Sequence, residues 1–407
     1  MSQELARANR PEEVGLSSER LRRLSNELTI GIEKGLVPGA VALIARSGKI
    51  AYLEALGFRD REAHAPMMPD TIFRIASMTK PFTSVAAMML AEEGKLFIPD
   101  PVARYIPEFA NIKVAVRSDE TSAKTLKTEA CRRDMTVQDL LRHTSGLTYP
   151  MLTGPLLRQA YEAANVVDIE QSNSDMVARL ATIPLAYQPG STWQYGMSTD
   201  VLGRVVEVAS GMPLDLFILD RICRPLGLKD TTFGSISADR AAQPQVEAGS
   251  GKRPPMLDTG GRPKWIAGGS GLLSTATDYA TFCQMLLNRG ELNGDRLLAP
   301  ASVALMTADH LNPDIEPSPS TRPLFGALAP ASELGIGFGL GFAVRTHAGR
   351  NPLPGSLGDF SWGGVTGTYF WIDPKLELIA ILLMQAPAQR LSYRYLMRTL
   401  VYQAIMD

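Results

Sequence analysis

The stretch from Arg74 to Lys95 constrains the fold of this chain most strongly. It predicts a helix that begins at or near Ser77 and ends at Gly94, because apolar residues recur at helical spacing and a glycine closes the run. Since apolar residues lie on nearly every side of this helix, we expect it to be buried. Ser77 and Lys80 conflict with that burial. They are three residues apart, so they share one face of the first turn.

A serine and a lysine in one helical turn suit nucleophilic catalysis. A serine hydroxyl attacks poorly until a base takes its proton, and a lysine can be that base only where burial or a nearby charge lowers its pKa. The first N–H groups of a helix have no helical partner, so the N–H of Ser77 is placed to stabilise an oxyanion. Chance alone supplies roughly one or two Ser-x-x-Lys matches in a chain of this length. This chain has a single match, and it opens the most apolar helix.

Length and composition narrow the class of protein. A chain of 407 residues, close to half of them apolar, can bury more than one core, and its length suggests two or three domains. The net charge of −1 and the lack of a long basic run argue against nucleic acid as a partner. The cysteines, Cys131, Cys223 and Cys283, are too far apart in sequence to suggest a disulfide framework or a cysteine-rich metal site.

The N-terminal residues contain no hydrophobic core of a secretion signal, and no apolar run reaches membrane-spanning length. We therefore expect a soluble cytoplasmic protein with no membrane partner. The pattern specifies no oligomeric state.

Helices and strands are expected at both ends of the chain, and short helices with many prolines between residues 100 and 260. The residues 378–384 are apolar on both faces, which is typical of a central strand. The prediction is one discontinuous α/β (α+β) domain, residues 1–99 and 261–407, with a mainly helical inserted domain, residues 100–260. The expected helices lie at 17–35, 136–142, 198–211 and 277–288, with a last helix that carries Met397, Leu400, Val401, Ala404 and Ile405. Ser17 is expected to cap the first helix, Thr136 to open the second with a capping box, and Tyr195 to lie just before the third. The expected strands lie at 39–45 and 50–57, joined as a hairpin by a turn at Ser47-Gly48, and at 335–344, 360–372 and 378–384.

Three ordered motifs resemble the serine β-lactamase and penicillin-binding-protein superfamily: Ser77-Met78-Thr79-Lys80, Tyr195, and Trp362-Gly363-Gly364. More closely, the chain is similar to the family VIII carboxylesterases, which are related to class C β-lactamases. The likeness extends over nearly the whole chain, through the segments 140–147, 269–272 and 337–342. It implies a β-lactamase/transpeptidase-like fold, in which helices flank an antiparallel sheet.

The resemblance also implies a role for each matching residue. Ser77 matches the nucleophile and Lys80 its partner, and Tyr195 matches the tyrosine that relays the proton to the leaving group. A free tyrosine has a pKa of about 10, so this role needs the lysine cation nearby. In the third motif, Gly363 and Gly364 allow close backbone approach, and Val365 is expected to give the second oxyanion N–H. No metal or organic cofactor is implied.

Two positions depart from the lactamase pattern. Met197 replaces the asparagine of Tyr-x-Asn, and Trp362 replaces the lysine of Lys-Thr-Gly. Those polar residues hold the amide and carboxylate of the antibiotic in lactamases, whereas a neutral ester needs neither. The resemblance therefore implies a serine carboxylesterase that hydrolyses short-chain acyl esters, a small-molecule substrate, through an acyl-enzyme on Ser77.

Other functions compete with this one. A Ser-His-Asp hydrolase would need His143, the only histidine in a suggestive motif, but its surroundings indicate a structural bend, and the chain has no Gly-x-Ser-x-Gly. A β-lactamase, a D-alanyl-D-alanine peptidase and an acyltransferase would use the same nucleophile. A non-catalytic scaffold would explain Tyr195 and Trp362 as packing residues, yet it has no need of a buried lysine. Residues 149–156 are expected to line the pocket.

Overall fold

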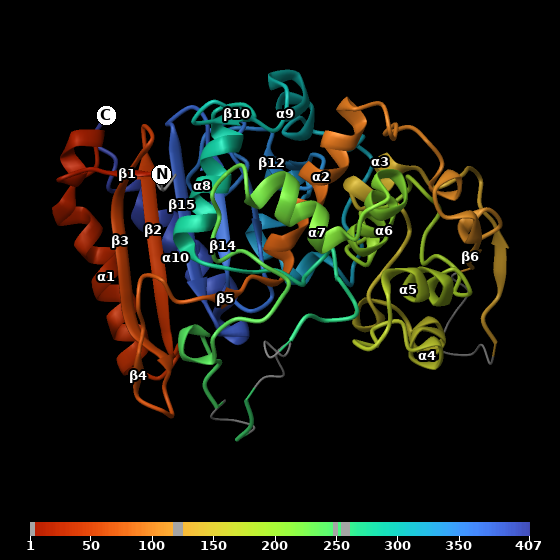
Figure 1. Ribbon diagram of the computed structural model, residues 1–407, viewed down its shortest axis with the longest axis horizontal. Coiled ribbons are helices and arrows are strands. Elements are labelled where there is room, and N and C mark those ends of the chain that lie inside the picture. The colour runs from red at the N-terminus through yellow and green to blue at the C-terminus, as the bar shows by residue number, and fades with distance from the viewer. Residues whose placement is uncertain (1–4, 117–124, 247–250, 254–260) are drawn as a thin grey trace.

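The computed structural model describes residues 5–116, 125–246, 251–253 and 261–407. A large sheet forms its centre, with strands in the order β1-β3-β2-β15-β14-β13-β12-β11 and β4 paired with β3 (Figure 1). Neighbouring strands are antiparallel except for β1 and β3, which are parallel. The strands of this sheet are β1 Ala6–Arg7, β2 Gly39–Arg46, β3 Lys49–Asp60, β4 Ala65–Pro66, β11 Ile336–Phe338, β12 Ala343–Arg345, β13 Phe360–Gly363, β14 Tyr369–Asp373 and β15 Leu378–Met384.

Two adjacent interior strands, β2 and β15, are buried along their whole length. Successive side chains of a strand point to opposite faces, so apolar residues at every position supply two cores at once. Ala40, Ala42 and Ile44 join the core on one face, and Val41 and Leu43 join the core on the other. The expectation that residues 378–384 form a central strand is confirmed.

Helices cover both faces of the sheet (Figure 1). The first and last helices, α1 and α10, pack on one face, and α2 and α8 pack on the other. As the sequence predicts, Ser17 caps α1 by accepting the N–H of Arg20 at 3.2 Å. The α-helices are α1 Ser18–Glu33, α2 Lys80–Glu92, α3 Val137–Leu141, α4 Pro155–Ala164, α5 Asn173–Leu180, α6 Ser198–Ser210, α7 Leu214–Ile218, α8 Ala276–Leu287, α9 Pro300–Met306 and α10 Arg390–Tyr402.

Helices α3 to α7 gather beside the sheet, on the right of Figure 1. Helix α6 packs against α2 and so joins this helical part to the sheet. The capping box expected at Thr136 is present, since Thr136 and Asp139 satisfy each other's backbone N–H. The division into residues 1–99 with 261–407 and residues 100–260 stays a prediction. Three small strand pairs complete the described fold: β5 Phe73–Arg74 with β8 Leu273–Ser274, β6 Lys113–Ala115 with β7 Thr128–Ala130, and β9 Glu291–Leu292 with β10 Asp295–Arg296.

Three expected elements differ from the structure. Residues 360–372 are two antiparallel strands, β13 and β14, rather than one, because the chain reverses at Gly364–Thr368, where Gly367 takes φ +112°. Residues 335–344 likewise form the hairpin of β11 and β12 around Gly341, at φ +107°. Only glycine adopts such angles without strain. Helix α2 begins at Lys80 rather than Ser77, since residues 76–79 form a tighter 3₁₀ turn, η2, at its entrance.

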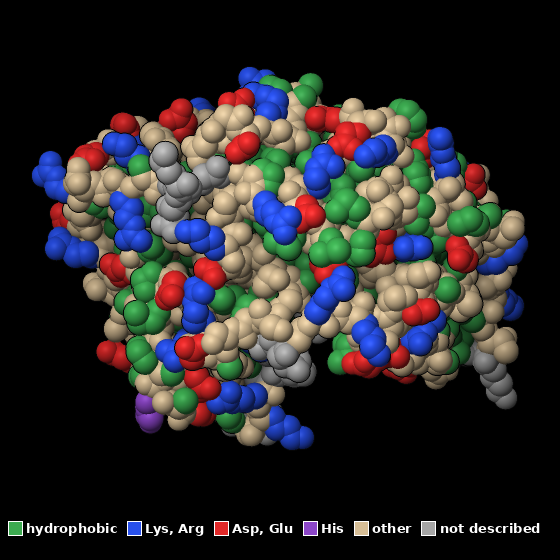
Figure 2. Space-filling model, viewed as in Figure 1, with side chains coloured by type: hydrophobic (Ala, Val, Ile, Leu, Met, Phe, Trp, Pro, Cys, Tyr) green, Lys and Arg blue, Asp and Glu red, His purple; other side chains and the backbone are tan. Residues whose placement is uncertain are grey.

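The described helices include none that combines the length and apolarity needed to cross a membrane. On the face shown in Figure 2, Lys and Arg side chains alternate with Asp and Glu side chains and do not gather by sign.

Candidate active site

Ser77 lies in η2, directly before α2, and only 8% of its surface is exposed. The residue before it, Ala76, has φ +46°, a left-handed conformation that costs a non-glycine residue on the order of 1 kcal/mol. Such strain persists only where the surroundings fix the backbone. Here the N–H of Ile75 donates to Leu272 at 3.1 Å, and the carbonyl of Ile75 accepts the hydroxyl of Thr368 at 3.1 Å.

Lys80 is almost fully buried, with 1% exposed, and each of its nearest polar neighbours is an acceptor. Its Nζ donates to the carbonyl of Gly269 at 2.8 Å, to Ser77 Oγ at 3.3 Å and to the hydroxyl of Tyr149 at 3.4 Å. A buried ammonium group is tolerable only when its donors are satisfied in this way. As expected from their spacing, the side chains of Ser77 and Lys80 lie on the same side of the buried turn that leads into α2.

Tyr195 arrives from a segment 118 residues away and places its hydroxyl 2.6 Å from Ser77 Oγ. It lies just before α6, where the sequence predicts it. Gly196 lets this segment approach the chain at Thr148, because a Cβ there would lie 2.4 Å from the Cα of Thr148. The Nζ of Lys80 is 4.7 Å from the centre of the Tyr195 ring. The structure therefore brings together Ser77, Lys80 and Tyr195.

The turn between β13 and β14 is fastened to the backbone that precedes Ser77. A Cβ on Gly364 would lie 2.5 Å from the carbonyl oxygen of Ile75 and 3.1 Å from Ala76 Cβ, so this position has room only for glycine. Thr366 donates its hydroxyl to the carbonyl of Arg74 at 3.0 Å. Val365, between these anchors, is 60% exposed. The third sequence motif thus borders the Ser77 turn.

Two further residues at the site, Tyr149 and Asp200, had no catalytic role in the sequence prediction, although Tyr149 falls in the segment expected to line the pocket. Asp200 is 2% exposed and accepts the N–H of Gly269 at 2.9 Å, so one peptide segment contacts both Asp200 and Lys80. Burial raises the pKa of Asp200, while the charge of Lys80 opposes that rise. Burial raises the pKa of Tyr149, and the nearby Asp200 carboxylate raises it further. Acidic residues are common in the first turn of a helix, so the position of Asp200 carried no specific signal for a place at the site.

Aromatic side chains surround Tyr195, and we call Trp193, Tyr195, Phe325, Phe338 and Trp362 the aromatic cluster. Its ring centroids are 5.0 to 6.3 Å apart, at the spacing of packed aromatic pairs. Trp362 is 3% exposed, and Met197 is fully buried. At both positions where lactamases carry a polar residue, this chain therefore has a buried apolar one.

His143 contacts the ring of Tyr195, with 4.9 Å between the ring centroids. Its φ of +58° places it at a bend, and its Nδ1 has no hydrogen-bond partner among the described residues. Burial lowers the pKa of His143 well below its usual value, and Lys80 lowers it further. These features fit a neutral packing residue at a bend.

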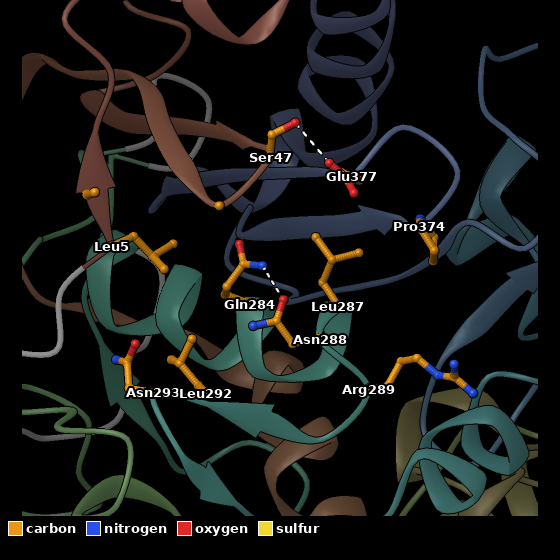
Figure 3. Close-up of a pocket in the computed structure, with 12 residues that line it drawn as sticks. Leu5, Ser47, Gln284, Leu287, Asn288, Arg289, Leu292, Asn293, Pro374 and Glu377 are labelled. Atoms are coloured by element: carbon orange, nitrogen blue, oxygen red, sulfur yellow. Dashed lines mark hydrogen bonds between the residues drawn. The ribbon is translucent and has the colours of Figure 1, made fainter.

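A cavity of about 700 Å³ is lined by residues of the β2–β3 turn, of α8 and of the turn between β14 and β15 (Figure 3). In it, Ser47 donates to Glu377 at 2.9 Å and Gln284 donates to Asn288 at 2.7 Å. Pro374 of this cavity follows the end of β14, whereas the turn beside Ser77 precedes its start. The five residues of β14 separate the two places by about 16 Å. The cavity is thus no part of the site around Ser77.

Comparison with known proteins agrees with this geometry. Residues 25–398 match the family described as Beta-lactamase. Protein Rv1367c of Mycobacterium tuberculosis is 38% identical over 365 residues, which cover 87% of each chain. Esterase EstB of Burkholderia gladioli is 33% identical over 370 residues, which cover 88% of each chain. Among solved structures, EstCE1, described as a hydrolase with promiscuous acyltransferase activity, superposes with a TM-score of 0.75 and 28% identity, over 94% of this chain and 99% of its own.

Proposed function

Since the chain belongs to the beta-lactamase family and is a serine hydrolase, we propose that it is a family VIII carboxylesterase that hydrolyses short-chain acyl esters through an acyl-enzyme on Ser77. The observation that carries this proposal is the pair of contacts on Ser77 Oγ, which lies 2.6 Å from the Tyr195 hydroxyl and 3.3 Å from Lys80 Nζ. A nucleophile needs a base within hydrogen-bond reach and a group that orients the base. Tyr195 and Lys80 meet both needs.

In the first half of the reaction, Tyr195 and Lys80 act as one base. The Lys80 ammonium near the tyrosine ring favours negative charge on the tyrosine oxygen, which takes the proton from Ser77. Ser77 Oγ then bonds to the ester carbonyl carbon. The oxyanion is stabilised by the N–H groups of Ser77 and Val365. As the tetrahedral intermediate collapses, the C–O bond to the alcohol breaks, and Tyr195 gives its proton to the leaving alcohol.

In the second half, water takes the place of the alcohol. Tyr195 accepts a proton from water as the oxygen attacks the acyl carbon, and the same proton returns to Ser77 as the acid leaves. One water is consumed, and the enzyme regains its starting protonation. Catalysis of this kind by a positioned acid and base contributes roughly 10²- to 10⁴-fold in rate.

The buried apolar residues at positions 197 and 362 support a neutral substrate. Met197 offers only a weakly accepting sulfur and Trp362 only a single neutral N–H, so neither replaces the amide or the cation that holds a β-lactam in lactamases. A site that lacks partners for a charged group leaves that group desolvated and unpaired, which disfavours its binding. A neutral ester avoids this penalty.

Acyl transfer to an alcohol is the second candidate, and the structural likeness to EstCE1 favours it. The acyl-enzyme on Ser77 is common to both reactions. The two differ only in whether water or an alcohol accepts the acyl group. Methanol added to an ester assay distinguishes them, since transfer produces the methyl ester in place of the acid.

The test of the proposal is a comparison of kcat/KM for p-nitrophenyl butyrate and for a chromogenic cephalosporin, with Ser77→Ala as the control. We expect ester turnover to exceed cephalosporin turnover and Ser77→Ala to be inactive while still folded. Faster turnover of the cephalosporin would contradict the interpretation of Met197 and Trp362 and favour a lactamase. Retained ester turnover in Ser77→Ala would refute the role of Ser77.

A further inference from the structure

Arg394 of α10 lies buried behind the third motif, with 4% of its surface exposed. Its Nη2 donates to the carbonyl of Gly364 at 2.5 Å and to the carbonyl of Thr368 at 3.2 Å. In the described part of the chain, no carboxylate forms a salt bridge with it. Arg398, one helical turn later, is bound instead by the carboxylate of Asp359 at 2.9 Å. Arg394 is thus a buried cation that is held by two backbone carbonyls and by the face of the Tyr369 ring, whose centre lies 5.6 Å from its Cζ.

The carbonyl that Arg394 binds belongs to the same peptide group as the N–H of Val365. A trans peptide is planar, and its C=O and N–H point in opposite directions. The described peptide bonds are all trans. A guanidinium on the carbonyl side therefore directs the N–H of Val365 away from α10, and Gly364 packs on the opposite side against Ile75 and Ala76.

We propose that Arg394 is a positioning residue for ester hydrolysis: its buried guanidinium holds the Gly364–Val365 peptide and polarises it, so that the N–H of Val365 binds the oxyanion more strongly. The proposal rests on the proposed function, because this oxyanion forms only if Ser77 attacks a carbonyl. A hydrogen bond to a cation withdraws electron density from the carbonyl oxygen, which makes the N–H of the same peptide a stronger donor.

The two glycines of the motif have different neighbours, since Gly363 ends β13 and Gly364 begins the turn. A Cβ on Gly363 would lie 2.7 Å from the Cζ of Arg394, so glycine there makes room for the guanidinium. A Cβ on Gly364 would meet the backbone of Ile75 on the other side. The motif is therefore built to fit between Arg394 and the turn that contains Ser77.

The charge on Arg394 persists at neutral pH. Burial lowers the pKa of Arg394 to about 10, which still leaves the guanidinium protonated. Its Nε is buried with no hydrogen-bond partner among the described residues. Neutral donors could satisfy the same two carbonyls without the cost of burying a cation and leaving one N–H unpaired. The arrangement thus favours a role for the charge beyond packing.

The experiment compares Arg394→Met with Arg398→Met, which removes an equally buried arginine from the same helix but does not touch the turn. We measure kcat and KM for p-nitrophenyl butyrate at a temperature where circular dichroism shows each variant folded. A second probe is the inhibition constant of a butyl trifluoromethyl ketone, which forms a tetrahedral adduct with a nucleophilic serine and so places an oxyanion in the site. A purely structural role would not change this constant in step with kcat.

For Arg394→Met we expect kcat to fall by about 10- to 100-fold with little change in KM. This loss is smaller than the roughly 100- to 1,000-fold loss in kcat for removing an oxyanion donor outright, because the N–H of Val365 remains in place. Ketone affinity should fall by a similar factor. Arg398→Met should lose thermal stability but keep kcat within about twofold of the wild type. If Arg394→Met does not fold, Arg394→Gln, which keeps a neutral donor for the carbonyls but removes the charge, is measured by the same criteria.

An unchanged kcat and ketone affinity in the folded Arg394 variant would overturn the proposal, as would losses no larger than those of Arg398→Met. A rise in KM alone would also overturn it, since that indicates lost ground-state binding. A wild-type protein that does not hydrolyse the ester refutes the proposed function instead, so the two failures are distinguishable.

Discussion

Removal of the Tyr195 hydroxyl separates a catalytic tyrosine from a packing one. Tyr195→Phe keeps the ring, which lies 5.2 Å from Phe325 and 5.5 Å from Trp362 between centroids. It deletes only the oxygen 2.6 Å from Ser77 Oγ. One net hydrogen bond is worth about 1 kcal/mol of stability. Loss of the acid–base group should raise the barrier by about 2.7 to 5.4 kcal/mol, because each tenfold loss in rate corresponds to about 1.4 kcal/mol.

The assay therefore has two readouts on one variant. Urea unfolding should show a loss of about 1 kcal/mol, and kcat/KM for p-nitrophenyl butyrate should fall by about 10²- to 10⁴-fold. Tyr149→Phe is the matched control, because its hydroxyl contacts Lys80 at 3.4 Å and makes no hydrogen bond to Ser77 among the described contacts. It should lose less activity than Tyr195→Phe. A Tyr195→Phe enzyme that keeps its kcat would refute the relay and leave Tyr195 as a packing residue.

Three further predictions concern the groups around Ser77 and the helical part. Lys80→Met should reduce kcat about as severely as Tyr195→Phe, since residues that act as a unit fail together, and steady-state kinetics checks this. Asp200→Asn keeps an acceptor for the N–H of Gly269 but removes the buried charge, so kcat should fall by about tenfold with KM unchanged. For Asp139, burial would raise the pKa, but Arg133 and neighbouring donors lower it to about 2 from 3.8. A lowered folded-state pKa stabilises the fold above pH 3.8, and this stability is lost as pH falls toward 2. Asp139→Asn should therefore lower the free energy of unfolding, measured by urea titration, by about 2 kcal/mol at neutral pH and by progressively less in acid.

Local patterns predicted the elements that depend on neighbouring residues. The cap at Ser17, the capping box at Thr136 and the hairpin turn at Ser47-Gly48 follow from side chains within a few positions. The central place of β15 also follows from its sequence, because only a strand buried on both faces can be apolar at every position.

The incorrect predictions of secondary structure fall where tertiary contacts determine the backbone conformation. The reversal at Gly364–Thr368 depends on hydroxyl groups that bind the chain at Arg74 and Ile75, nearly 300 residues away. The entrance turn at residues 76–79 is likewise held by contacts with Leu272 and Thr368. The two residues of each such contact lie too far apart in the chain for a local sequence pattern to reveal it.

At the candidate site, spacing alone places Ser77 beside Lys80, whereas motif resemblance was needed to bring in Tyr195. Asp200 was absent from the prediction because its partner, Gly269, is 69 residues away and acts through backbone groups that carry no sequence signal. Arg394 was absent for the same reason, since it binds the third motif through carbonyl oxygens.

The most direct test of the central claim is to trap the acyl-enzyme. Rapid acid quenching of the protein during turnover of p-nitrophenyl butyrate, followed by peptide mass spectrometry, locates the butyryl group. We predict that the group is on the peptide that contains Ser77 and is absent from Ser77→Ala treated in the same way. A butyryl group on another residue that turns over at the catalytic rate, or one that persists in Ser77→Ala, would contradict the mechanism.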